Sequence, residues 1–513
     1  MRATNENPIL PNARLDQLTS WDSDWAGLKV VVAGLGVSGF SVADTLIELG
    51  ARVVVVDGNA SDVNQEKEQT LRIIGAADVL LGEGVMDDLP TVDGDKADLV
   101  ITSPGLRPTL GILADAVKQG VQIWGDVELA WRLREREGRK TAQWLCITGT
   151  NGKTTTVGML ESILQTAGFK AIAVGNVGTP ILDALRDPVE YDFFAVELSS
   201  FQLHWTHSMS PLASVVLNVA EDHVDWHEGY ANYLADKARI YENTQVACIF
   251  NANQNEIVKM VEEADVIEGA RAIGFWANTP SISMLGVIDG LLIDRAFLDD
   301  RHTKALEIGA VQDTGQLPTR HTIENALAAS ALARAAEIEP EKIREGLRAY
   351  EPGAHRIQLV ANTHGVLWVN DSKATNPHAA NASLASFKPV IWIAGGLSKG
   401  VEYDELVTEH KDRLKAVIVI GTDHQKLLDA LEHHAPEVPV HNITERAKDQ
   451  GLDPTDGHWA MSQAVAVAHE LSAQDDTVLM APAAASMDQF DTYAHRGNTF
   501  IDAVAKLVDD ING

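Results

Sequence analysis

The segment "ITGTNGKTTT", residues 147–156, combines two glycines with one lysine and several threonines. It follows an apolar run typical of a buried strand and precedes a helical pattern, so its backbone N–H groups would face an anion at a helix N-terminus. In such a loop Lys153 would contact the outer phosphates and Thr154 would lie beside Mg²⁺. The loop is shorter than the usual G-x-x-x-x-G-K-[ST] pattern, because Ile147 stands where the first glycine is expected. The segment predicts an ATP site, and a chance glycine turn is the alternative.

Polar side chains follow other apolar runs of the same region. In "AVELSSFQL", Glu197 ends a run and could bind Mg²⁺ beside the phosphate loop, because parallel strands meet at one sheet edge; a solvated cap is the alternative. In "EDHVD", His223 lies beside Asp222 and Asp225, which fits a capping cluster as well as a second cation site. The spacing in "YLADKARIYEN" assigns Lys237 to a solvated helix face.

A second glycine loop lies near the start of the chain, in "VVVAGLGVSGF". Gly34, Gly36 and Gly39 come after a strand pattern and before a helical one, and Asp57 ends the next strand, where a ribose-binding acid is expected. The loop predicts a helix N-terminus that faces a phosphate, with tight strand–helix packing alone as the alternative. The motif leaves open whether the ligand is NAD or another phosphate-bearing molecule.

Three polar loops follow strand patterns in the last third of the chain. "NDSKATNPHAA" contains Asp371, Lys373 and Thr375, "AGGLSKG" contains Lys399, and "APAAASMDQF" contains Ser486. Loops at one strand-end rim favour a ligand site, and turns stabilised by Asn and Asp side chains are the alternative.

Strand-like and helical runs alternate along the whole chain, which is typical of parallel sheets covered by helices. We predict three consecutive α/β domains, with Rossmann-like N- and C-terminal domains around a central P-loop ATPase-like domain. The predicted ranges are 1–138, 139–351 and 352–513. Within 278–318 only "GLLIDRAF" reads as a strand, and the rest is expected to form loops.

Composition narrows the class of protein. The formal net charge of -32, from 41 basic and 73 acidic residues, argues against binding of nucleic acid or anionic membranes. Both cysteines lie in apolar runs, so we expect buried thiols rather than a disulfide framework. The start of the chain lacks the apolar core of a signal peptide, and no apolar run reaches the ~18 residues of a spanning helix. We expect a cytoplasmic protein without membrane insertion and with a short, mobile N-terminal extension.

The motifs "GTNGKTT", "ELSSFQL", "EDHVD", "DKARIYEN", "HR", "NDSKATN" and "DQF…RGN" occur in this order. With them the chain resembles the Mur ligases over 34–498. The resemblance implies ATP-dependent addition of D-glutamate to UDP-N-acetylmuramoyl-L-alanine through an acyl phosphate, in peptidoglycan precursor synthesis, by a monomer. It also implies that the first glycine loop holds a UDP-sugar rather than NAD.

The resemblance implies roles for individual residues. ATP would contact Gly149, Thr150, Asn151, Gly152, Lys153, Thr154, Thr155, Asn325, Arg356 and Asp371. Two Mg²⁺ ions would be held by Thr154, Glu197, His223 and a CO₂-derived carbamate on Lys237, with Lys153, His223 and Lys237 as catalytic residues. The UDP-sugar would contact Gly36, Val37, Ser38, Asp57, Gly105 and Asn176. D-glutamate would contact Lys373, Thr375, Lys399, Ser486 and Tyr493.

The chain departs from the family pattern at some positions. Gly58 and Asn59 stand where the family often has a Thr-Arg pair, and Tyr493 stands where a phenylalanine is common. The end of the segment "AGGLSKG" differs from the usual family sequence, which contains Asp-Lys or Asp-Arg. The alternatives are another Mur-type amino-acid ligase, a folylpolyglutamate-type ligase, an NAD-dependent oxidoreductase and a regulatory ATP-binding switch without ligase chemistry.

Overall fold

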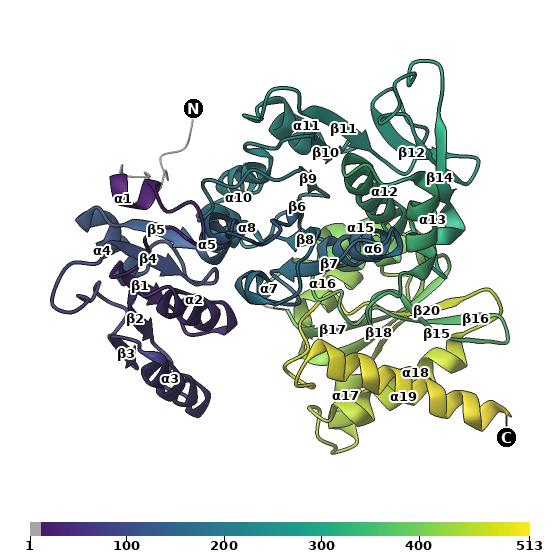
Figure 1. The fold of residues 1–513 in the computed structure, drawn as a ribbon. Helices are drawn as coiled ribbons and strands as arrows, with labels where there is room; N and C mark the ends of the chain where they lie inside the picture. The colour runs from purple at the N-terminus through teal and green to yellow at the C-terminus, as the bar shows by residue number, and fades with distance from the viewer. Residues whose placement is uncertain (1–11, 399, 513) are drawn as a thin grey trace. The chain divides into compact units, whose positions relative to one another are not determined.

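The computed structural model describes residues 12–398 and 400–512. Packing divides the chain into two compact units (Figure 1). One unit runs to Asp313 and includes Ile323–Tyr350, and the other comprises Thr314–Thr322 and the residues from Glu351 on. The first unit contains two sheets and the second unit one, each mainly parallel, so the predicted fold class of three consecutive α/β sheets is confirmed. The boundaries at 138/139 and 351/352 stay predictions.

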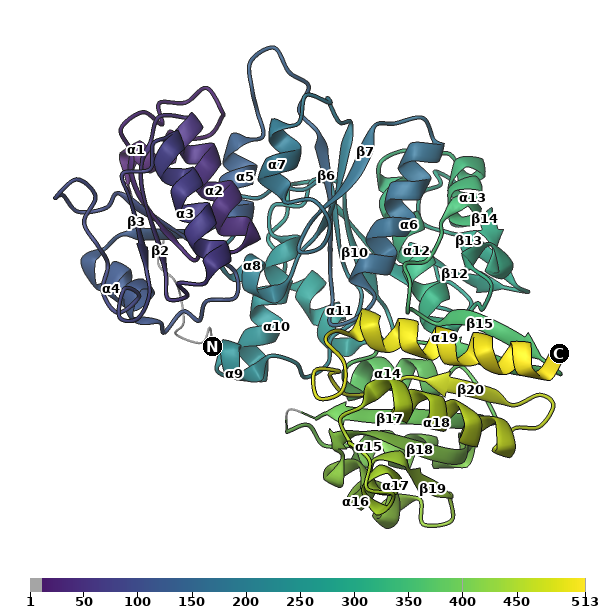
Figure 2. The ribbon, with the colours of Figure 1, turned by 90° about the horizontal axis from the view of Figure 1, so that it is seen from below.

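The first sheet is parallel, with the strand order β3-β2-β1-β4-β5. Its strands are β1 (Lys29–Ala33), β2 (Arg52–Asp57), β3 (Asp78–Leu81), β4 (Leu99–Thr102) and β5 (Gln122–Gly125). The helices of this region are α1 (Ala13–Asp16), α2 (Val37–Glu48), α3 (Asp62–Ile74), α4 (Gly111–Gln119) and α5 (Asp126–Leu133). Alternate residues of β1 face opposite layers: Val30 packs with α2, α3 and α5, and Val31 packs with α4 (Figure 2). The strand order reverses at β1, which places the first glycine loop at the switch point where α/β sheets bind ligands.

The second sheet has the order β14-β13-β12-β11-β10-β9-β6-β8-β7. Its strands are β6 (Gln143–Thr148), β7 (Ala171–Gly175), β8 (Phe193–Glu197), β9 (Ala213–Val216), β10 (Ala247–Asn251), β11 (Arg271–Phe275), β12 (Met284–Ile288), β13 (Leu291–Asp294) and β14 (Leu306–Ala310). The helical segments are α6 (Lys153–Thr166), α7 (Ile181–Arg186), α8 (Ser200–His204), α9 (Val224–His227), α10 (Tyr230–Ala238), η1 (Arg239–Tyr241), α11 (Asn255–Glu262), η2 (Val311–Thr314), α12 (Arg320–Ala335) and α13 (Pro340–Ala349).

The expectation that 278–318 contains one strand and otherwise loops is wrong. β12 joins β11 in parallel, and β13 and β14 then extend the sheet in antiparallel pairing. A two-residue turn joins β12 to β13, because Ile288 pairs with Leu291. Asp289 and Gly290 in that turn have φ angles of 50° and 78°. An Asp-Gly pair is a strong hairpin signal because both turn positions need positive φ, so the sequence carried evidence for this hairpin.

The third sheet has the order β15-β16-β20-β17-β18-β19, and only β15 is antiparallel to its neighbour. Its strands are β15 (Gln358–Thr363), β16 (Val366–Asn370), β17 (Val390–Leu397), β18 (Leu414–Asp423), β19 (Val440–Asn442) and β20 (Thr477–Met480). The helical segments are α14 (Pro377–Leu384), α15 (Asp404–His410), η3 (Lys411–Arg413), α16 (Gln425–His434), α17 (Ile443–Asp449), α18 (Gly457–Leu471) and α19 (Tyr493–Asn512). Helices α14–α16 cover one face, and α17–α19 cover the other.

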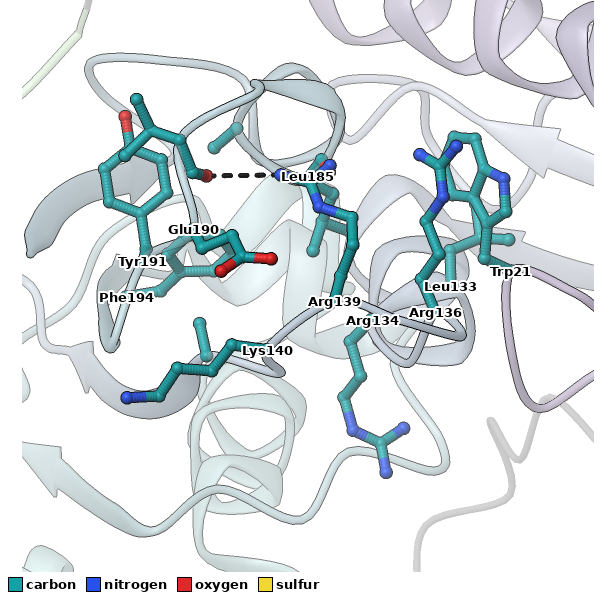
Figure 3. Close-up of a pocket in the computed structure, with 13 residues that line it drawn as sticks. Trp21, Leu133, Arg134, Arg136, Arg139, Lys140, Leu185, Glu190, Tyr191 and Phe194 are labelled. Carbon is teal, nitrogen blue, oxygen red and sulfur yellow. Dashed lines mark hydrogen bonds between the residues drawn. The ribbon is translucent and has the colours of Figure 1, made fainter.

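The linker after α5 is packed against the second sheet. Trp131 and Trp144 meet edge to face with ring centroids 5.0 Å apart, within a core shared by the first two sheets. Arg139 donates to the carbonyl oxygen of Leu185 over 3.4 Å (Figure 3). Beside it Arg134, Arg136 and Lys140 line a cavity of about 30 Å³, which has room for about two waters. The cavity is too small for a nucleotide, and the predicted site residues lie elsewhere.

The expected N-terminal extension is only partly described, because residues 1–11 lie outside the described residues. From residue 12 on the expectation of mobility is wrong, since Leu15 and Trp25 are buried in the core of the first sheet. Apolar side chains spaced along this segment supply the burial that holds it. Within 12–398 and 400–512, no helix is both long and apolar enough to cross a membrane.

Candidate active site

The predicted phosphate loop joins β6 to α6. Gly149 and Gly152 have φ angles of 156° and 83°. A Cβ on Gly152 would lie 2.5 Å from the side-chain oxygen of Asn325, so only glycine fits there. Asn151 donates its backbone N–H to the Asn218 side chain over 2.8 Å. The glycines therefore allow a tight turn into the helix N-terminus, and Asn325 of α12 lies against this turn; its nucleotide contact stays a prediction.

Lys153 begins α6 and turns its side chain back over the loop. Its Nζ donates to the carbonyl oxygens of Gly149 and Thr150 over 2.8 and 2.9 Å. Thr154 and Thr155, in the first helical turn, are half-buried. The loop thus places an ammonium group and two hydroxyl groups at a helix N-terminus, which is the chemistry that a polyphosphate requires.

Glu197 ends β8 next to β6 and is 1% exposed. One carboxylate oxygen accepts a hydrogen bond from the Asn176 side chain over 3.1 Å, and the other, Oε2, is buried without a hydrogen-bond partner. A buried carboxylate oxygen without a partner is costly, and oxygen ligands are those that Mg²⁺ prefers. Within the described residues no three His, Cys, Asp or Glu side chains form a metal-binding group. The unpartnered carboxylate oxygen of Glu197 fits the Mg²⁺ ligand that the sequence predicts at this position.

His223 lies in the left-handed region, with a φ of 53°, directly before α9. Its ring packs against Phe201 with centroids 4.8 Å apart, and its Nε2 lies 3.6 Å from Asp222. Burial, together with the charges of Lys153 and Lys237, lowers the pKa of His223 more than Asp222 raises it. The imidazole is therefore biased toward the neutral form, which can accept a hydrogen bond or bind a cation.

The prediction from helical spacing that Lys237 lies on a solvated face is wrong. Lys237 is 2% exposed, with Nζ donating to the Gly149 carbonyl over 3.0 Å and lying 3.4 Å from the Thr148 hydroxyl. Burial, followed by the nearby charge of Lys153, lowers the pKa of Lys237 well below its usual value. A neutral amine is a nucleophile that can react with CO₂, so its environment fits the predicted carbamate.

In the first glycine loop Asp57 holds the backbone rather than pointing freely at a ligand. Its two oxygens accept the backbone N–H groups of Leu35 and Asn59 over 2.6 and 2.7 Å. Gly36 caps α2, and Val37, the first residue of that helix, is 71% exposed. The N-terminus of α2 is therefore open to a ligand, with Ser38 in its first turn.

The first loop region reaches the second sheet through Gly105. The Trp226 indole donates to the carbonyl oxygen of Gly105 over 3.3 Å, and Trp226 lies in α9, three residues after His223. The predicted UDP-sugar residues Gly105 and Asn176 thus lie close to elements that also carry His223 and Glu197. A long substrate bound at α2 could extend toward the phosphate loop within one packed unit.

Two predicted residues of the second unit, Lys373 after β16 and Tyr493 at the start of α19, lie in contact. Lys373 donates to the Tyr493 hydroxyl over 3.3 Å, and its Nζ lies 4.9 Å from the centre of that ring. Ser486 is buried and Thr375 is exposed. Lys399 lies outside the described residues. Lys373 and Tyr493 thus meet, as expected for one subsite.

Asp371 follows β16 and is buried. Burial raises its pKa to about 6, against hydrogen bonds from Ser383 and Ile357 and the charge of Arg356. Arg356 is half-buried. Their placement beside each other supports one polar cluster at the start of the second unit.

The sequence reasoning missed three buried charged residues. Arg496 donates to the Ser372 and Ala484 carbonyl oxygens over 3.0 and 3.1 Å and so ties two predicted ligand loops together. Asp126, which directly follows β5, leaves one oxygen without a partner. Asp236 accepts hydrogen bonds from two histidines. "HRGN" and the strand-end acid in "GDVEL" were signals for the first two, but nothing in the local spacing marked Asp236.

Comparison with known proteins covers all three sheets. Three family models match: "Mur ligase MurD-like, N-terminal domain" over residues 28–125, "Mur ligase middle domain" over 147–333 and "Mur ligase, glutamate ligase domain" over 355–484. A UDP-N-acetylmuramoylalanine--D-glutamate ligase of Streptomyces coelicolor is 49% identical, over 94% of this chain and 99% of that protein. The protein of the same name from Leifsonia xyli is 47% identical, over 96% of this chain and 95% of its own length.

Solved structures show the same fold at low identity. A pseudomurein peptide ligase type C from Methanothermus fervidus has a TM-score of 0.53 at 16% identity, covering 93% of this chain and 100% of that one. MurF from Acinetobacter baumannii has a TM-score of 0.52 at 15% identity, covering 92% and 90%. The relatives match nearly the whole chain and the family models match each of its sheets, so the resemblance predicted from the motifs is confirmed and the chain belongs to the Mur ligase family.

Proposed function

We propose that the protein is an ATP-dependent ligase that joins D-glutamate to UDP-N-acetylmuramoyl-L-alanine, with release of ADP and phosphate, in peptidoglycan precursor synthesis. The observation that carries the proposal is the junction of Lys153, Lys237 and the phosphate loop at Gly149, one strand away from the buried acid Glu197. Relatives at 46–49% identity that carry the name of this ligase support the choice of substrates.

The chemistry explains why such a site is needed. A carboxylate is a poor electrophile, so the alanyl carboxylate first attacks the γ-phosphorus of ATP, the bond to ADP breaks, and an acyl phosphate forms. The amine of D-glutamate then attacks the acyl carbon, phosphate leaves with the C–O electron pair, and the amine loses a proton. Phosphoryl transfer depends chiefly on positioning and charge neutralisation. With a net charge of -32, the protein must supply those cations locally.

Each group has a proposed part in this scheme. Lys153 and the N-terminus of α6 would bind the outer phosphates, and neutral His223 would contact the substrate or a cation. Two Mg²⁺ ions would neutralise phosphate charge when bound, held by Thr154, Glu197, His223 and a carbamate on Lys237. Burial of Lys237 keeps its amine neutral enough to accept CO₂.

The substrate contacts follow the three sheets. We propose that Gly36, Val37, Ser38, Asp57, Gly105 and Asn176 bind the UDP-sugar, with Asp57 acting by holding the loop. Lys373, Thr375, Lys399, Ser486 and Tyr493 would bind D-glutamate. Gly149, Thr150, Asn151, Gly152, Lys153, Thr154, Thr155, Asn325, Arg356 and Asp371 would bind ATP.

We propose further that the protein acts as a monomer in the cytoplasm, where ATP and nucleotide-sugars are available. Both cysteines are free and buried, which is compatible with this proposal.

The test is ADP release in the presence of UDP-N-acetylmuramoyl-L-alanine and ATP, comparing D-glutamate with L-glutamate, L-alanine and a diamino acid. Only D-glutamate should stimulate release. Stimulation by a different amino acid would instead identify another Mur-type ligase, and release that needs no amino acid would indicate a regulatory ATPase. The phosphate loop and the family assignment argue against the NAD-dependent alternative, which gives residues 149–155 no role.

A further inference from the structure

Beneath the proposed catalytic groups, one buried carboxylate joins three helices. Asp236 of α10 lies with both oxygens 3.0 Å from His204 Nδ1, and its Oδ2 is 2.8 Å from His227 Nδ1. The other ring nitrogen of His227 lies 2.9 Å from the Ser200 hydroxyl. Asp236 and His227 are 8% and 3% exposed. We call Asp236, His204, His227 and Ser200 the anchor cluster.

The Asp236 carboxylate determines the direction of its two hydrogen bonds with the histidines. Burial raises the cost of ionising Asp236, but hydrogen bonds with His204 and His227 outweigh it and lower the pKa of this carboxyl. An ionised carboxylate only accepts hydrogen bonds, so both Nδ1 atoms carry a hydrogen. The other ring nitrogen, Nε2, is hydrogen-bonded to the Ser200 hydroxyl. A carboxylate–histidine pair of this kind fixes ring tautomer and orientation.

The elements joined by the anchor cluster are short. Helix α8 has 5 residues and α9 has 4, so neither is stable by its own backbone hydrogen bonds. Aromatic packing adds to the cluster, because the Phe201 ring contacts the rings of both His227 and His223, with centroids at 5.5 and 4.8 Å. The orientation of these two short helices therefore depends on side chains, with Asp236 as their common acceptor.

Members of the anchor cluster lie close in sequence to the proposed catalytic and metal-binding residues. Ser200 follows Glu197 by three positions, and His227 follows His223 by four. Asp236 directly precedes Lys237, and successive side chains of a helix point about 100° apart. Asp236 therefore contacts α8 and α9 while Lys237 contacts the phosphate loop through Gly149. Because Asp236 and Lys237 are adjacent and bind partners on different sides of α10, together they fix the rotation of this helix about its axis.

We infer that Asp236 is a positioning residue that sets Lys237, His223 and Glu197 in register for the ligase reaction by holding α8, α9 and α10 together through His204 and His227. The inference rests on the proposed function for the identity of the reaction. It predicts that loss of the carboxylate harms the chemical step more than substrate binding, because small displacements of reacting groups lower the rate steeply.

The experiment compares the full-length wild type with Asp236→Asn and His227→Gln, which break the same link from its two sides. Asp294→Asn is the matched control: Asp294 is also buried and ion-paired, with Arg334 Nε at 3.1 Å, but its partners lie outside α8–α10. For each protein, kcat and KM for ATP are measured per folded molecule, thermal unfolding is recorded, and a carbamate on Lys237 is followed by ¹³C NMR in ¹³C-bicarbonate.

We expect Asp236→Asn and His227→Gln to lose about 10- to 100-fold in kcat while KM for ATP changes by less than about threefold. The carbamate signal should weaken in both. Asp294→Asn should lower the unfolding temperature but keep kcat and the carbamate signal. A wild-type kcat in Asp236→Asn, or an equal loss in Asp294→Asn, would overturn the inference. Failure of the proposed function differs, since the wild type itself would then release no ADP with D-glutamate, and the ¹³C signal, which needs no substrate, would still report how Lys237 is placed.

Discussion

Lys237 Nζ lies 3.0 Å from the carbonyl oxygen of Gly149, so a buried amine supports the phosphate loop from below while Lys153 contacts the same carbonyl oxygen over 2.8 Å. Two lysines that share an acceptor repel each other, and this charge is one cause of the lowered pKa of Lys237. The pair thus places two lysine side chains at the phosphate loop, one at the start of α6 and one buried in α10.

Replacement of Lys237 by alanine should abolish ligase activity, with a loss of about 100-fold or more. Added acetate or formate should restore part of it, because a small carboxylate can occupy the space of the missing carbamate. Rates are measured as ADP release with and without each acid. Lys170→Ala, at an exposed position of the same sheet region, is the control and should behave as wild type. If Lys237→Ala keeps the wild-type rate without additives, the carbamate proposal fails.

Replacement of Lys153 by alanine should eliminate ATP use while leaving UDP-sugar binding intact, because the first glycine loop lies on a different sheet. Removing one charged phosphate contact from such a site costs about 10²- to 10³-fold in rate. Single-turnover ADP formation and UDP-sugar binding by calorimetry are the measurements. Normal turnover in Lys153→Ala would contradict the assignment of the phosphate loop.

Local pattern predicted the elements of the sheets well where strands are buried on both faces. "QWLCIT" and "VLWVN" match β6 and β16 residue for residue, because continuous apolar runs between helical segments leave few other readings. The β12–β13 hairpin was missed because its strands are short and alternate weakly, although Asp289 and Gly290 marked the turn.

Site residues next to strands could be predicted from sequence, and those set by tertiary packing could not. Glu197 ends β8, and Lys153 begins the helix that follows the adjacent strand β6, so topology alone places both at one edge of the sheet. Lys237 lies in a helix whose charged residues suggest a solvent face, and only packing under the phosphate loop buries it. The role of Asp236, one residue earlier, could not be predicted from the sequence either, because its partners His204 and His227 come from other helices.

Glutamine at position 197 should raise the Mg²⁺ concentration required for half-maximal activity by about tenfold or more, because the unpartnered oxygen Oε2 would become an NH₂ group that cannot bind a cation. Without Mg²⁺ the variant should unfold at the wild-type temperature or higher, since it no longer buries a lone carboxylate oxygen. Glu161→Gln is the control: Glu161 accepts the Ala173 N–H over 2.9 Å elsewhere in the same sheet region. An unchanged Mg²⁺ requirement in Glu197→Gln would remove this residue from the metal site.

Asparagine at position 371 should stabilise the protein at neutral pH. Burial raises the pKa of Asp371 from 3.8 to about 6, so the folded chain holds this proton more tightly than the unfolded chain. The carboxyl therefore favours folding below about pH 4, and that contribution is lost as the pH rises to about 6, a change of about 3 kcal/mol. Asparagine stays neutral, so its advantage in free energy of unfolding should grow between about pH 4 and 6 and then level off. Urea unfolding across this range measures it, with exposed Asp412→Asn as the control that should show no such trend. A variant less stable than wild type at pH 8 would show that ionised Asp371 is stabilised by its surroundings.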